Sequence, residues 1–169
     1  MICFITGGAR SGKSRYAQQM ALAESENPVY VATAPHFPDD KEFTERIKRH
    51  QLDRDERWTN MEEPLHPGKL DLQGRTVVID CVTLWLSNIF SLTNGCVEDS
   101  LAFFKKEVDM IEQINGSFFI VSNEIGMGIH AETETGRKFT DLQGMANQYF
   151  ASRANKVVFM ISGLPLTVK

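Results

Sequence analysis

A glycine-rich run near the amino end of the chain constrains its fold more than any other feature. The run is Gly7-Gly8-Ala9-Arg10-Ser11-Gly12-Lys13-Ser14, which fits the pattern G-x-x-x-x-G-K-[ST]. Glycines in such a run let backbone N–H groups turn inward and form a concave anion-binding site. The pattern has this meaning only between a strand and a helix. Here it follows the apolar run 2–6 and precedes a helical stretch over 13–25, so the sequence predicts a phosphate-binding loop at a helix amino terminus.

Besides the loop backbone from Gly7 to Ser14, three side chains are expected to contact the phosphates of a bound nucleotide or the magnesium ion beside them. Lys13 can reach the β- and γ-phosphates, and the hydroxyl of Ser14 can bind Mg²⁺. Asp80 closes the apolar run 76–79 and is the expected carboxylate ligand of the same ion, with a helix-capping role as the alternative. Glu124 follows a later apolar run and is a second carboxylate where ligands of open α/β sheets bind, again with capping as the alternative.

Short apolar runs alternate with longer helical patterns along the chain. Helices are expected over 13–25, 40–51, 83–92, 98–115 and 137–155, and buried strands over 2–6, 29–33, 76–80, 118–122 and 157–162. The polar stretch 52–75 is expected to run over the surface. This alternation predicts an α/β fold of the P-loop NTPase type, with a mainly parallel sheet and helices on both faces. We expect residues 1–169 to form one nucleotide-binding domain.

Composition and charge exclude several classes of protein. The 169 residues carry 18 Lys and Arg against 22 Asp and Glu, a net charge of −4, which argues against a general nucleic-acid binder. No apolar run approaches the roughly 18 residues of a membrane span, and the amino end does not have the form of a signal peptide. The three cysteines lack metal-site spacing and two of them lie in apolar runs, so free thiols and a cytoplasmic location are expected.

A basic segment follows the second predicted strand. Arg46 and His50 are four residues apart in a helical pattern and would share one face of a helix, with Arg49 beside them and Arg54 and Arg57 further on. In a chain of negative net charge, this concentration of arginines is suited to phosphate. A solvated helix face with an incidental histidine explains the same pattern.

Six segments of the chain together resemble a known family of enzymes. In order, they are GGARSGKSRYAQ, VYVATA, ERIKRHQLDRDERWTNME, VVIDCVTLWLSN, VSNEIGMGI and DLQGMANQYFASRANKVVFMISGLP. This succession resembles the bifunctional adenosylcobinamide kinases / adenosylcobinamide-phosphate guanylyltransferases of cobalamin biosynthesis. The resemblance covers almost the whole chain, and R-I-x-x-H-x-x-x-R-x-x-x-W and N-E-[VI]-G-x-G make it far more specific than a phosphate loop alone.

The resemblance implies two activities in one domain. The first is phosphorylation of the side-chain hydroxyl of adenosylcobinamide with ATP or GTP, with Mg²⁺ as the expected cofactor. In the second, GTP donates GMP to a histidine and releases pyrophosphate, and adenosylcobinamide phosphate then accepts the GMP to give adenosylcobinamide-GDP. A histidine suits this role because neutral imidazole is a nucleophile near pH 7. The family also implies a homo-oligomer, with a trimer as the expectation.

Site residues follow from the resemblance position by position. His50 occupies the histidine of the R-I-x-x-H pattern and is the expected guanylylated residue, although some relatives carry two adjacent histidines where this chain has Arg49 and His50. The expected nucleotide contacts outside the phosphate loop are Thr33, Ala34, Pro35, Gln51, Leu52, Asp53, Glu62 and Asp80. The later motif, with Asn123, Glu124, Gly126 and Gly128, is expected near the corrinoid or at a subunit contact.

Two other functions are compatible with a phosphate loop. One is a small-molecule kinase without guanylyl transfer, in which His50 only positions phosphate. The other is a switch-type GTPase, but the sequence contains no N-K-x-D motif for guanine and no D-x-x-G switch after a strand.

Overall fold

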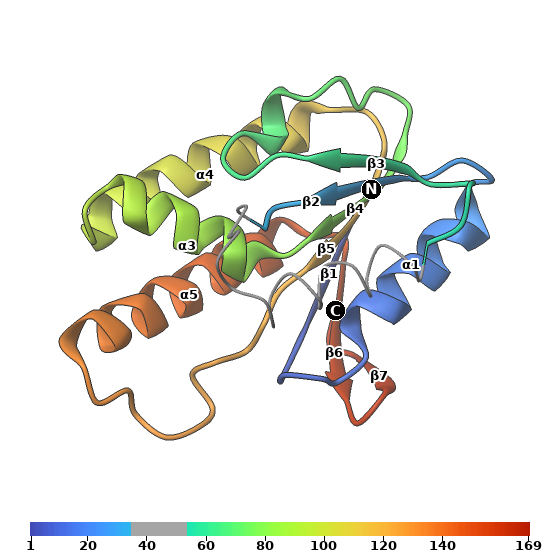
Figure 1. Cartoon of the computed structure of the whole chain (residues 1–169). Helices are drawn as coiled ribbons and strands as arrows, with labels where there is room; N and C mark the ends of the chain where they lie inside the picture. The colour runs from blue at the N-terminus through green and yellow to red at the C-terminus, as the bar shows by residue number, and fades with distance from the viewer. Residues whose placement is uncertain (35–53) are drawn as a thin grey trace.

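A seven-stranded sheet forms the centre of the molecule in the computed structural model, which describes residues 1–34 and 54–169 (Figure 1). The strand order is β3-β2-β4-β5-β1-β6-β7. All neighbouring strands are parallel except β6 and β7, which form an antiparallel pair. The strands are β1 (Ile2–Gly7), β2 (Val29–Ala32), β3 (Thr59–Glu62), β4 (Thr76–Asp80), β5 (Ser117–Val121), β6 (Lys156–Ile161) and β7 (Leu164–Thr167).

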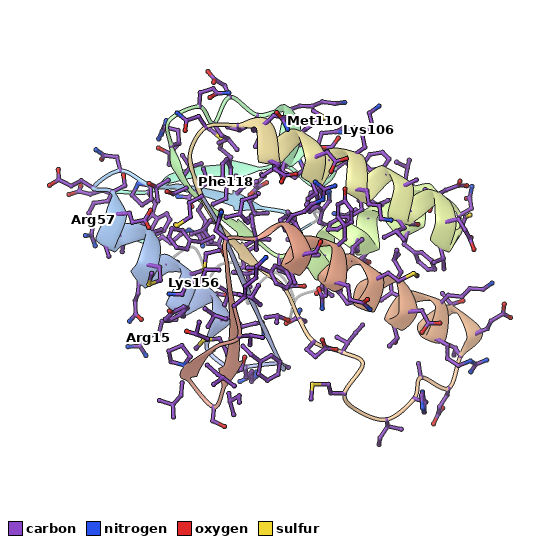
Figure 2. All side chains as sticks on the ribbon, turned by 180° about the vertical axis from the view of Figure 1, so that it is seen from behind. Arg15, Arg57, Lys106, Met110, Phe118 and Lys156 are labelled. Carbon is purple, nitrogen blue, oxygen red and sulfur yellow. The ribbon has the colours of Figure 1, made fainter. Side chains whose placement is uncertain are left out.

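Helices cover both faces of this sheet. Among the described helices, α1 (Lys13–Glu24) lies on one face, and α3 (Val82–Leu92), α4 (Val97–Gln113) and α5 (Glu134–Arg153) form a layer on the other (Figure 1). A short 3-10 turn, η1 (Pro67–Lys69), packs beside α4. Figure 2 views the molecule from behind, with Arg15 on α1 and with Lys106 and Met110 on α4 in the opposite layer.

The alternation of side chains along each strand divides the core in two. In β1, Ile2 and Phe4 face the layer of α3, α4 and α5, whereas Cys3 and Ile5 face α1. Because both sets are apolar, the central strands are buried on both faces, as a parallel sheet between two helical layers requires. Aromatic pairs such as Phe4 with Phe150, whose ring centroids are 5.6 Å apart, fill the larger half of the core.

The structure confirms the predicted α/β class and most of the predicted elements. All five predicted strands are present, as are the helices predicted near 13–25, 83–92, 98–115 and 137–155. The predicted helix over 40–51 lies outside the described residues. Within residues 1–34 and 54–169, no helix combines the length and the apolar character that crossing a membrane requires.

Two of the described strands were not predicted, and one of them lies in the stretch 52–75, for which only a course over the surface was expected. Thr59–Glu62 forms the edge strand β3, paired with β2, and the turn η1 follows it. Leu164–Thr167 forms the opposite edge strand, β7. Both segments are largely exposed, so neither has the buried apolar pattern by which the other strands are predicted. Backbone pairing with a neighbouring strand, which leaves no mark on the side-chain sequence, makes them strands.

Candidate active site

The glycine-rich run forms the connection between β1 and α1. Gly7 is the last residue of β1, and Gly12 precedes the helix with φ of 90°, in the left-handed region that favours glycine. Arg10 also has a positive φ, of 55°, and lies exposed on the loop. The N–H of Gly163, directly after β6, donates to the carbonyl oxygen of Ser11 at 3.1 Å. This bond ties the loop to the end of β6, the strand that lies beside β1. The loop is therefore a fixed cradle at the amino end of α1, as the sequence predicts.

Lys13 and Ser14 open α1 directly after this cradle. Lys13 is buried, and its Nζ donates to the carbonyl oxygen of Gly8 at 2.6 Å and lies 3.5 Å from Oγ of Ser11. The ammonium group thus folds back over the loop, where it would meet the phosphate oxygens of a nucleotide. Ser14, half-buried, is the second residue of the helix, so its hydroxyl is at the same end of α1.

Asp80 ends β4 on the face of the sheet that α1 covers. Its Oδ2 accepts a hydrogen bond from the hydroxyl of Tyr30 at 2.8 Å. Burial, followed by the nearby charge of Asp80, raises the pKa of Tyr30 well above its usual value, so Tyr30 remains a hydrogen-bond donor at neutral pH. The guanidinium carbon of Arg54 lies 3.8 Å from the centre of the Tyr30 ring. Arg57, in contrast, pairs with Asp55 on the surface at 2.6 Å.

Thr33 and Ala34 follow β2 at the same edge of the sheet. The backbone N–H of Thr33 donates to the carbonyl oxygen of Asp80 at 3.1 Å, and its hydroxyl donates to the carbonyl oxygen of Cys81 at 2.7 Å. Asn88, on α3, donates to the carbonyl oxygen of Thr33 at 2.9 Å. These bonds make the end of β2 a rigid neighbour of Asp80.

The sequence-predicted site residues divide into three groups. The carboxyl ends of parallel strands bring Gly7, Ala32 and Asp80 to one edge of the sheet together with the phosphate loop and Thr33. Glu62 ends β3 at this edge, aligned with Ala32, but it is exposed and lies beyond β2. The remaining predicted residues lie outside the described residues and are Pro35, His50, Gln51, Leu52 and Asp53.

The donor set fits magnesium rather than a transition metal. The described ranges contain no group of three or more His, Cys, Asp or Glu side chains placed to hold a metal ion. Magnesium needs no such cage, since it is usually held by one or two protein oxygens together with phosphates and water. The hydroxyl of Ser14 and the carboxylate of Asp80 are such oxygens on the face that α1 covers.

Several residues of this edge were not predicted from the sequence. From the sequence, Tyr30 is expected to be only a core residue of its strand, yet its hydroxyl donates a hydrogen bond to the carboxylate of Asp80. Thr83, on α3, and Asn147, on α5, hold the backbone after β5. A polar residue within an apolar helix face is the only sequence signal for Asn147, and it does not reveal which segment the side chain holds.

The chain is similar to known proteins over almost its whole length. A family model described as "Cobinamide kinase / cobinamide phosphate guanyltransferase" matches residues 3–168. The bifunctional adenosylcobalamin biosynthesis protein CobP of Pseudomonas aeruginosa is 34% identical over 171 residues, covering 98% of this chain and 95% of that protein. The CobU proteins of Escherichia coli and Salmonella typhimurium, described as bifunctional in the same way, are 32% and 31% identical, and both alignments cover 100% of each chain. Among solved structures, the flagellar accessory protein FlaH of Methanocaldococcus jannaschii superposes with a TM-score of 0.46 at 15% identity, covering 99% of this chain and 77% of that one.

Proposed function

Since this chain belongs to the cobinamide kinase / cobinamide phosphate guanyltransferase family, we propose that one phosphate loop serves both of its reactions and that His50 carries GMP between donor and acceptor. Membership makes the chain a transferase of cobalamin biosynthesis, a cobinamide kinase and cobinamide-phosphate guanylyltransferase. The observation that carries the shared site is the position of Lys13, whose ammonium group folds over the loop at 2.6 Å from the carbonyl oxygen of Gly8.

In the kinase step, the side-chain hydroxyl of adenosylcobinamide attacks the γ-phosphorus of ATP or GTP. The backbone N–H groups of the loop from Gly7 to Ser14 bind the phosphates, and Lys13 offsets the negative charge that develops on them. Backbone groups contact phosphate rather than base, which is why both nucleotides are candidates. Magnesium, held by Ser14 and Asp80, would add positive charge beside the β- and γ-phosphates.

In the guanylyl step, the imidazole of His50 attacks the α-phosphorus of GTP, a P–N bond forms and pyrophosphate leaves. An oxygen of cobinamide phosphate then attacks the same phosphorus, and the P–N bond breaks to release adenosylcobinamide-GDP. The described residues on either side of the segment 35–53 both lie close to Asp80. Ala34 follows Thr33, which is bonded to Asp80, and Arg54 lies on the ring of Tyr30, which is bonded to the same Asp80.

The remaining nucleotide contacts are proposed on the same basis. Thr33 and Ala34 lie at the carboxyl edge beside Asp80, and Glu62 ends β3 at that edge. The other contacts that we propose, from the match to the family, are Pro35, Gln51, Leu52 and Asp53.

The experiment that tests this proposal is intact-mass measurement after incubation with GTP and Mg²⁺, at neutral pH because a phosphoramidate is acid-labile. We expect an adduct of the mass of GMP on the unmodified chain and none on His50→Ala. The control His36→Ala, which removes the other histidine of the segment 35–53, should still form the adduct. An adduct that persists on His50→Ala would place the nucleophile elsewhere. If no variant forms an adduct while GTP still binds, the kinase-only function is the correct one.

We also propose a single domain, a homo-oligomer and a cytoplasmic location. All seven strands of the described residues lie in one sheet, and β7 is an edge strand that exposes Leu164 and Leu166. Apolar edge strands are typical sites of pairing with another chain. Light scattering of the unmodified chain and of Leu166→Lys tests this, with a trimer as the expected state. The three cysteines are free thiols, as is typical of reducing compartments.

A further inference from the structure

The chain after β5 passes directly beside the phosphate loop. The backbone N–H of Glu124 donates to the carbonyl oxygen of Gly7 at 3.0 Å. Because Gly7 is the first residue of the loop, this bond fixes the backbone of Glu124 at the start of the predicted phosphate-binding loop. Figure 1 shows the long connection from β5 to α5 leaving the sheet at the edge from which the loop also leaves.

Two helices hold the peptide that precedes Glu124. The backbone N–H and the Nδ2 of Asn123 both donate to Oγ1 of Thr83 on α3, at 3.2 and 3.1 Å. The carbonyl oxygen of Asn123 accepts from Nδ2 of Asn147 on α5 at 3.1 Å. Asn147 is itself buried and accepts from Ser122 at 2.6 Å. The entry to this connection is thus fixed from α3, α5 and β1, although the connection further on is exposed.

The carboxylate of Glu124 is half-buried and only partly engaged. Its Oε1 accepts from the backbone N–H of Gly126 at 2.9 Å, which orients the group. In the part of the chain that the structure describes, its Oε2 makes no hydrogen bond or ion pair. Of the two strands that flank β1, β5 is followed by this carboxylate, whereas the turn after β6, at 162–163, carries none.

We propose that Glu124 is the general base of the kinase step, an inference that rests on the proposed kinase reaction at this loop. The O–H bond of the cobinamide hydroxyl breaks and its proton passes to the carboxylate of Glu124. The hydroxyl oxygen forms a bond to the γ-phosphorus, and the bond from that phosphorus to the bridging oxygen breaks, so that its electron pair leaves with the nucleoside diphosphate. A carboxylate has this role in other phosphoryl transfers to hydroxyl groups.

The two reactions of this enzyme differ in their need for such a base. A hydroxyl must lose its proton as it attacks, whereas the phosphate oxygen of cobinamide phosphate is already ionised when it attacks the guanylylated enzyme. The loading of the enzyme with GMP uses no cobinamide at all. Removal of the base therefore affects the kinase step and leaves the other two steps intact.

The test compares the unmodified chain with Glu124→Gln and with the control Glu132→Gln, which removes an exposed carboxylate from the same connection. Three rates are measured: phosphorylation of cobinamide with ATP, loading with GMP from GTP, and transfer of GMP to cobinamide phosphate supplied ready-made. For Glu124→Gln we expect the kinase kcat to fall at least about 100-fold, as for other lost general bases. The other two rates should change by less than about threefold, because no transition-state contact is removed there.

Three outcomes would overturn the assignment. One is an unchanged kinase kcat in Glu124→Gln, and another is a parallel fall of all three rates, which would show a structural role. The third concerns Glu124→Asp, which keeps a carboxylate and should retain more kinase activity than Glu124→Gln, so equal loss in both contradicts a base. If the unmodified chain itself does not phosphorylate cobinamide or is not loaded with GMP, the proposed function is wrong. Failure of the proposed function is therefore distinguishable from failure of the role assigned to Glu124.

Discussion

The hydroxyl of Tyr30 donates to Oδ2 of Asp80 at 2.8 Å, joining the middle of β2 to the carboxylate that ends β4. The same ring packs edge-on against Trp58, with centroids 6.0 Å apart, and lies under the guanidinium of Arg54. Tyr30 therefore fixes the orientation of Asp80 from a position within the core. No pattern in the sequence marks this tyrosine as part of the site.

Replacement of Tyr30 by Phe should weaken the use of magnesium. With the hydrogen bond gone, the carboxylate of Asp80 is no longer held in one orientation, and a bond of this kind contributes on the order of 1 kcal/mol. We expect the half-saturating Mg²⁺ concentration of the kinase reaction to rise about tenfold, which corresponds to about 1.4 kcal/mol. The control is Trp58→Phe, which shrinks the neighbouring ring and should lower stability without changing the Mg²⁺ requirement. An unchanged requirement in Tyr30→Phe would show that the bond only satisfies a buried hydroxyl.

The first two glycines of the phosphate loop should respond differently to alanine. A Cβ on Gly7 would lie 2.5 Å from the carbonyl oxygen of Met160 in β6, and its φ of 149° is already unfavourable for other residues. A Cβ on Gly8 would meet nothing within 4 Å. We expect Gly7→Ala to lower the free energy of unfolding by about 2–3 kcal/mol through backbone strain and overpacking, and Gly8→Ala to change it by less than about 0.5 kcal/mol. Urea denaturation measures both, and equal effects would contradict the close approach of β1 to β6.

A buried glutamate should anchor the connection between β3 and β4. Glu107, on α4, is 3% exposed and accepts from Nδ1 of His66 at 2.8 Å and from the backbone N–H of Gly68 at 3.2 Å. Glu107→Ala leaves both donors unsatisfied, so we expect a loss of about 2–3 kcal/mol in the free energy of unfolding. Lys106→Ala, exposed on the same helix, should cost less than about 0.5 kcal/mol.

A double-mutant cycle isolates the pair of His66 and Glu107. Because the two side chains touch, the cycle should give a coupling energy of about 1–2 kcal/mol. If the losses of unfolding free energy in the His66→Ala and Glu107→Ala single variants are additive, the effect of Glu107→Ala comes instead from its bond to Gly68 and from packing.

The stability of the chain should fall at alkaline pH because of Cys81. Burial, followed by the negative charge of Asp80, raises the pKa of this thiol from 9.0 to about 12. Between these two values the unfolded chain has lost the proton that the native chain still holds, so the contribution is complete below pH 9 and is lost as the pH rises toward 12. The expected slope for this one group is about 1.4 kcal/mol per pH unit.

Unfolding experiments from pH 8 to 11 measure this slope in the unmodified chain and in Cys81→Ala. The slope should become shallower in Cys81→Ala and should persist in Cys96→Ala, whose thiol is not buried. A residual loss at alkaline pH is expected in both, because burial also raises the pKa of the Cys3 thiol and of Tyr30. Identical slopes in all three proteins would mean that Cys81 ionises as readily in the native chain as in the unfolded one.

The sequence by itself determined the class of fold and the place of the glycine-rich loop between the first strand and the first helix. The run from Gly7 to Ser14 between a strand and a helix is a local pattern, and its geometry depends on backbone conformations that these residues set themselves. The central strands are equally local, since burial on both faces requires continuous apolar residues. Asp80 was predictable for the same reason, as a carboxylate at the end of such a strand.

Only the tertiary structure decided which residues meet at the edge of the sheet. The edge strands β3 and β7 are defined by backbone pairing with their neighbours, and exposed side chains carry no record of that pairing. The bonds of Tyr30 to Asp80, of Asn147 to Asn123 and of Glu124 to Gly7 each join positions 24 to 117 residues apart in the chain. Such contacts depend on strand order and on which helix packs beside which strand. The local sequence around each residue does not specify either of these.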